Sequence, residues 1–104
     1  MRWWLTRLLD GGAKHAFEEA RRCLAEPTAS PKFVYVHLME THMYYHPPVG
    51  HAHLFLPDMR GRAPWSVNQN PLTLVSGETP MDELDFEIVE GLYNGAIHYT
   101  DRLF

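Results

Sequence analysis

The chain has 104 residues, 45% hydrophobic and 12% aromatic, which suits one small domain and is too aromatic for a disordered chain. Nine basic residues against thirteen acidic ones give a formal charge of −4. This charge argues against a nucleic-acid partner, because nucleic-acid binders usually carry a basic excess on one face. No apolar run approaches the ~20 residues that span a bilayer. The single cysteine, Cys23, excludes an internal disulfide framework.

Residues 1–10 combine two tryptophans and three leucines with interrupting charges. Arg7 divides the apolar part, Asp10 ends it, and no small-residue cleavage site follows. We therefore interpret this segment as a short packing element rather than a signal peptide. The sequence shows no recognisable targeting signal, and we assign no cellular compartment.

The first predicted element is a helix over residues 13–25. One apolar stripe recurs at helical spacing, and it comprises Ala13, Ala16, Phe17, Ala20, Cys23 and Leu24. Pro27 ends the pattern. On this stripe Cys23 is expected to be a small packed hydrophobic residue.

A nearly apolar run over residues 33–38 predicts a strand, because aromatic and β-branched residues dominate it. Such a strand is typical of a parallel sheet covered on both faces. From residue 39 to residue 79 the periodicity fails, and prolines and glycines predict a long loop with short helical turns near 52–56. Residues 71–75 are a weak candidate for a second strand.

The last predicted element is a helix that begins at Thr79 and Pro80, with Thr79 as its cap, and runs to about residue 103. One face carries Leu84, Ile88, Leu92 and Gly95, and its neighbour carries Phe86, Val89, Tyr93 and Ile97. The acidic run at residues 82–87 is expected to be a solvated helix start.

The predicted order is helix, strand, long loop, helix, which belongs to the α/β class. A lone parallel-type strand cannot satisfy its own ladder hydrogen bonds. We therefore expect residues 1–104 to be a single partial domain, an incomplete slice of a larger α/β sheet.

Five of the seven histidines fall between residues 37 and 53, namely His37, His42, His46, His51 and His53. Imidazoles at short spacing are typical zinc ligands, and an extended backbone would place His51 and His53 on one side. The alternative is a polar loop whose histidines bond to the backbone, and no metal ligand is assigned.

Two smaller features have both a binding and a structural interpretation. Trp3, Trp4 and Trp65 could stack on a sugar ring or fill an interface, and Arg60 and Arg62 could meet an anion or remain solvated.

Residues 40–48 follow the predicted strand with the order Glu40, His42, Tyr45 and Pro47-Pro48. This order resembles the acid-Pro-His-x-Pro-Tyr-x-Pro-Pro turn of the sulfatase family, within the alkaline-phosphatase-like superfamily. Thr41 and Tyr44 stand where the family pattern has its first two prolines.

A second block, at residues 92–101, reads Leu-Tyr-Asn-Gly-Ala-Ile-His-Tyr-Thr-Asp. It resembles the family's Leu-Tyr-Asp-Gly-x-Ile-x-Tyr-x-Asp helix, with Asn94 in place of an acid. The resemblance covers about residues 31–104 and implies an alkaline-phosphatase-like sandwich.

The resemblance implies a hydrolase of sulfate esters, acting on a small sulfate ester or a sulfated glycan. Such enzymes use a formylglycine nucleophile and Ca²⁺, and His42 matches a histidine that binds the sulfate. In this chain Cys23 is followed by Leu-Ala-Glu-Pro instead of the serine and arginine of the nucleophile motif. The metal half-sites also have no counterpart, so we assign no catalytic residue and expect the chain alone to be inactive.

Two rival functions remain open. The same superfamily scaffold handles phosphate and phosphonate esters. A non-catalytic, histidine-rich module that binds a metal or another ligand would belong to a different class.

Overall fold

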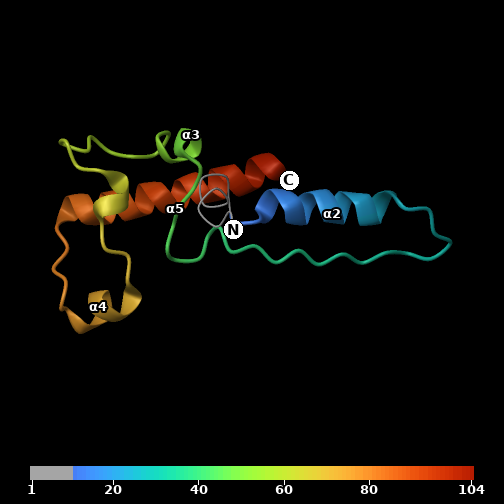
Figure 1. Ribbon diagram of the computed structural model, residues 1–104, viewed down its shortest axis with the longest axis horizontal. Helices are drawn as coiled ribbons and strands as arrows, with labels where there is room; N and C mark the ends of the chain where they lie inside the picture. Colours follow the sequence, from blue (N-terminus) through green and yellow to red (C-terminus); the bar gives the residue numbers. More distant parts are fainter. Residues whose placement is uncertain (1–10) are drawn as a thin grey trace, which may run out of the picture.

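The computed structural model describes residues 11–104, which form helices joined by irregular segments (Figure 1). The expectations for residues 1–10, including Trp3 and Trp4, lie outside this range. The elements are α2 (Ala13–Ala25), α3 (Val49–Ala52), the 3₁₀ helix η1 (Pro64–Ser66), α4 (Pro71–Ser76) and α5 (Glu83–Leu103).

The predicted α/β class is wrong for the described residues, because none of them forms a strand. Residues 33–38 are extended, and their exposure alternates with a period of two, whereas the nearly apolar sequence predicted a strand covered on both faces. Phe33 is 91% exposed and Tyr35 75%, whereas Val34 and Val36 are half-buried along a groove shared with α2. A strand requires a neighbouring strand for its ladder, and residues 11–104 place a helix there instead. The sandwich slice is therefore not observed.

Helix α2 has the predicted bounds, but its surroundings differ from the prediction. It begins after Gly12, whose φ of 113° gives a left-handed turn and whose position offers no capping side chain. Ala13 is its only buried residue. Cys23 is exposed, which corrects the expectation that it packs in a core. At the other end, Lys32 donates hydrogen bonds to the carbonyls of Cys23 and Glu26, near the last turn.

Residues 71–75, the weak strand candidate, belong instead to helix α4. The Asn70 side chain accepts a hydrogen bond from the Leu72 N–H at 3.1 Å, and Pro71 occupies the first helical turn. Gly77 ends the helix with a φ of 76°. These are standard helix start and stop signals, and they outweigh the β-branched residues between them.

Helix α5 reaches Leu103 as predicted, but it begins at Glu83, and its cap is Asp82 rather than Thr79. Asp82 accepts from the Asp85 N–H at 2.8 Å, and Asp85 accepts from the Asp82 N–H at 3.0 Å. This reciprocal pair satisfies two orphan donors at once, which a single threonine cap cannot do.

The core lies along the first of the two apolar faces of α5 that the sequence indicated. Ile88, Leu92 and Ala96 are fully buried, and Ala52 and Val67 cover them from the preceding loop. The neighbouring face, by contrast, leaves Phe86, Tyr93 and Ile97 exposed.

Two glycines let α5 approach that loop closely. A Cβ at Gly91 would meet the Phe55 carbonyl oxygen at 2.6 Å, and one at Gly95 would lie 3.1 Å from the Ala52 Cα. The helix and the loop therefore pack backbone against backbone, and α3 lies directly on α5.

The molecule divides into a body and an arm (Figure 1). The body comprises residues 44–104, built on α5, and the arm comprises residues 13–39, in which the extended segment runs back along α2. The Cα radius of gyration is 17.0 Å, against the ~13 Å typical of a compact domain this long. The arm contacts the end of α5, where Phe17 meets Phe104 with ring centroids 6.0 Å apart.

None of the helices formed by residues 11–104 combines the length and apolarity needed to cross a membrane.

Candidate functional site

The two blocks that carry the family resemblance, residues 40–48 and 92–101, lie against each other. The Tyr45 and Tyr93 rings have centroids 5.1 Å apart. A Cβ at Gly95 would come within 3.1 Å of the Pro47 ring. Pro47 is itself buried, so the proline pair anchors the turn on α5. Two motifs distant in sequence thus form one structural unit.

Gln69 holds the turn from the other side, and sequence reasoning missed it. Its side chain is 3% exposed, and its amide oxygen accepts from the Tyr45 N–H at 2.7 Å. Its amide nitrogen donates to the Tyr45 carbonyl at 3.3 Å. A buried glutamine that pairs with both backbone groups of one residue fixes that residue as a neighbouring strand would. A lone glutamine in an irregular region gives no signal of this role.

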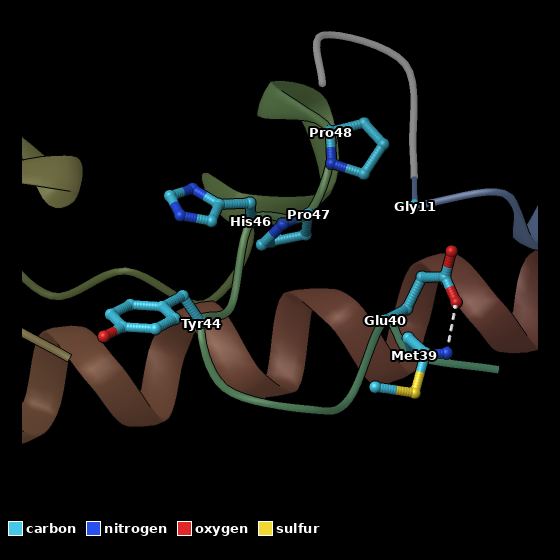
Figure 2. Close-up of a pocket in the computed structure, with 7 residues that line it drawn as sticks. All are labelled: Gly11, Met39, Glu40, Tyr44, His46, Pro47 and Pro48. Carbon is cyan, nitrogen blue, oxygen red and sulfur yellow. Dashed lines mark hydrogen bonds between the residues drawn. The ribbon is translucent and has the colours of Figure 1, made fainter. Parts of the chain in front are cut away.

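A small cavity of about 80 Å³ lies where the turn meets the start of the arm (Figure 2). Its lining residues are Gly11, Met39, Glu40, Tyr44, His46, Pro47 and Pro48. Figure 2 shows the Glu40 carboxylate turned toward Gly11, whereas the rings of His46 and Tyr44 point to the opposite side.

Glu40, the acid of the sulfatase-like turn, serves as a helix cap. Its Oε1 accepts from the Ala13 N–H at 2.9 Å and its Oε2 from the Met39 N–H at 3.1 Å. The carboxylate therefore neutralises the positive end of α2 and ties the arm to the turn. Sequence spacing gave no hint of this bond, because 27 residues separate its partners.

His42, the predicted sulfate-binding residue, is exposed on the turn and lies outside the cavity lining. Its Nδ1 hydrogen-bonds to the Met43 carbonyl, so Nδ1 carries the proton and donates. This bond orients the ring and leaves Nε2 directed to solvent, where it can meet a ligand.

His46 stacks on Trp65 with centroids 5.4 Å apart and an interplanar angle of 27°. Trp65 is 43% exposed. The stack joins η1 to the turn and leaves both interpretations of this tryptophan open.

The predicted pairing of His51 with His53 does not form. His51 lies in α3 and His53 is its exposed C-cap, so the backbone is helical where the prediction required it to be extended. His51 instead faces His98 of α5, with the two Nδ1 atoms 2.9 Å apart. The described residues hold no cluster of three or more His, Cys, Asp or Glu side chains suited to a metal.

The environment of His51 favours its neutral form. Its pKa lies below the ordinary 6.5, chiefly because burial disfavours the charged ring, and further because His98 and Arg102 add positive charge.

The basic residues at positions 60 and 62 differ in their surroundings. Arg62 forms ion pairs with Asp82, at 3.3 Å, and with Asp85, at the start of α5. Arg60 lies in a turn with a φ of 49° and is exposed. Arg62 is thus paired with the two carboxylates that cap α5, and the two arginines do not form a joint anion patch.

No family model, curated protein or solved structure matches this chain.

Proposed function

We propose that residues 31–104 contribute part of a sulfatase-like hydrolase that cleaves sulfate esters, with His42 as a residue that binds the substrate anion. The observation that carries the proposal is the packing of the two motif blocks on each other through Tyr45, Tyr93, Pro47 and Gly95. The contact supports the proposal, because a shared structural unit would keep the two blocks together.

His42 has the chemistry that the role requires. An imidazole can donate a hydrogen bond to an anionic oxygen or protonate a departing alkoxide. Because Nδ1 donates to the Met43 carbonyl, Nε2 is the nitrogen left for a ligand, and it donates to an anion or an alkoxide only when the ring is an imidazolium. The ring is exposed and thus open to a substrate that another part of the enzyme presents.

The described residues do not supply the formylglycine nucleophile or the Ca²⁺ site that the family uses. Cys23 is exposed on the arm and lacks the serine and arginine that formylglycine formation requires, and Glu40 is engaged as a helix cap. No set of carboxylates suited to Ca²⁺ gathers among residues 11–104. We therefore derive no hydrolytic step through these groups and propose that the chain alone binds but does not turn over a sulfate ester.

The test is an NMR titration of the histidine side chains with sodium sulfate at constant ionic strength. We expect the His42 ring resonances to shift in a saturable manner, whereas those of the exposed His53 stay constant. A parallel titration with phosphate separates the rival ester class, which predicts the larger response there. Equal, unsaturable shifts at both histidines would show nonspecific ion pairing and contradict the assignment.

A second measurement uses an aryl sulfate as substrate. We expect no turnover by the isolated chain, and turnover above background would contradict the proposal that it is inactive alone. The sulfate titration is then repeated on two variants. We expect His42→Ala to lose saturable sulfate binding and His53→Ala to keep it.

A further inference from the structure

Two imidazoles that the sulfatase-like proposal does not use face each other between α3 and α5. The Nδ1 atoms of His51 and His98 lie 2.9 Å apart, and the ring centroids are separated by 5.0 Å at an angle of 48°. Both side chains are half-buried. At this distance one Nδ1–H donates a hydrogen bond to the other Nδ1, so the two nitrogens face each other at the edge of the body, and a cation bound between them has to replace that proton.

The surroundings hold both rings in place. Tyr99 meets His51 edge-on at 5.0 Å, and Phe55 meets His98 edge-on at 5.7 Å. The backbone beneath the pair is also fixed, because the His51 carbonyl oxygen would lie 3.1 Å from a Cβ at Gly95. Little conformational entropy remains to be lost when a ligand joins the two nitrogens.

We propose that His51 and His98 form a two-histidine site for a borderline divalent metal ion, such as Zn²⁺, Ni²⁺ or Cu²⁺, with water completing the coordination. Two nitrogens bound at ~2.05 Å with an angle of ~90–110° between them are ~2.9–3.4 Å apart. The observed separation of 2.9 Å falls at the lower end of that range. Imidazole nitrogen suits these ions, whereas Mg²⁺ and Ca²⁺ require oxygen ligands.

The charge balance sets the expected strength of the site. Arg102 lies one helical turn beyond His98 on α5, and its positive charge opposes a bound cation. With two protein ligands and a nearby arginine, we expect binding far weaker than that of a four-ligand structural zinc site.

The experiment is calorimetric titration of the untagged chain with ZnCl₂ or NiCl₂. We expect one ion per chain, with affinity lower by about tenfold or more in His51→Ala and in His98→Ala. The matched controls are His53→Ala and His37→Ala, which remove exposed histidines and should leave the affinity unchanged. Arg102→Gln should bind the ion more tightly than the wild-type chain, and CaCl₂ should give no heat of binding.

Three outcomes would overturn the proposal. Equal losses in the His53→Ala control would show diffuse binding by the histidine-rich loop. Wild-type affinity in the double variant His51→Ala/His98→Ala would place the ion elsewhere. If the alanine variants lose their helical circular dichroism, the ¹⁵N shifts of the two rings in the wild-type chain decide, because zinc must move both Nδ1 resonances.

Discussion

The body and the arm of this molecule have similar apolar patterns but very different burial. In the body, Ile88, Leu92 and Ala96 are fully buried on α5. In the arm, Ala13 is the only buried residue, whereas Leu24 is 56% exposed and Phe33 91%. In both regions, apolar residues recur at the spacing of the local secondary structure, which is helical in α2 and α5 and extended in residues 33–38. The difference teaches that periodicity sets local conformation, whereas burial requires a second surface to pack against.

Close backbone contact distinguishes the body. Gly91 and Gly95 bring α5 against the loop that contains α3, and the buried Gln69 satisfies the backbone of the turn above it. The arm has one helix and one extended segment, and it meets the rest of the molecule through the Glu40 carboxylate, the Phe17–Phe104 ring contact and a hydrogen bond from Arg21 to the Leu103 carbonyl. We therefore expect the stability of the molecule to reside in the body.

The largest expected effect is that of Leu92→Ala, which empties a fully buried position. We expect it to lower the free energy of unfolding by ~2–5 kcal/mol, because the lost transfer energy and the cavity both contribute. Urea unfolding followed by far-UV circular dichroism measures the change. The control is Leu72→Ala in α4, where the side chain is 79% exposed. Equal costs for the two variants would contradict the assignment of the core to α5.

Gly91→Ala should come next, with a cost of about 1–3 kcal/mol, because the new Cβ would overlap the Phe55 carbonyl. The matched control is Gly50→Ala in α3, where a Cβ meets nothing within 4 Å. That control should be neutral or stabilising by ~0.4–1 kcal/mol. A stable Gly91→Ala variant would show that α5 and the loop are further apart than described.

A smaller effect is expected when the pH is lowered in metal-free buffer containing a chelator. The pKa of His51 is depressed in the folded chain, so below the ordinary 6.5 the unfolded chain binds a proton that the folded chain does not. Stability should therefore fall as the pH drops from 6.5 toward the depressed pKa, and then level off. His51→Asn should reduce this slope, and His53→Asn should not. An unchanged slope in His51→Asn would remove His51 as its cause.

The smallest effect is expected in the arm, where Phe33→Ser should change the free energy of unfolding by less than about 0.5 kcal/mol. The side chain is 91% exposed, so little apolar contact is lost. Amide exchange gives an independent check, with rapid exchange across residues 33–38 and strong protection around Leu92. Slow exchange in the extended segment would show that it pairs with something in solution.

The elements that sequence predicted well are those specified by nearby residues. The bounds of α2 and the two adjacent apolar faces of α5 follow from apolar spacing over a few turns. The sequence predicted Thr79 as the cap of α5, but the cap is Asp82. Asp82 and Asp85 form two reciprocal hydrogen bonds, and these fix the start of the helix. For residues 71–75 the capping signals were present in Asn70 and Gly77, but the β-branched residues obscured them.

The candidate site was predicted only in part. Sequence reasoning identified the turn with His42 and the helix with Gly95, but it could not place Gln69 on the Tyr45 backbone or join His51 to His98. Those contacts bridge 24 and 47 residues, and no local spacing encodes them. The capping role of Glu40 escaped prediction for the same reason.

The sequence by itself determined where the helices α2 and α5 form and which two adjacent faces of α5 are apolar, because backbone preference and apolar spacing act over a few residues. Only the tertiary structure decided which of those faces is buried, that residues 33–38 join no sheet among the described residues, that Glu40 caps α2 and that His51 meets His98. The physical reason is that hydrogen-bond and ligand partners are chosen by proximity in space, which the order of residues along the chain does not specify.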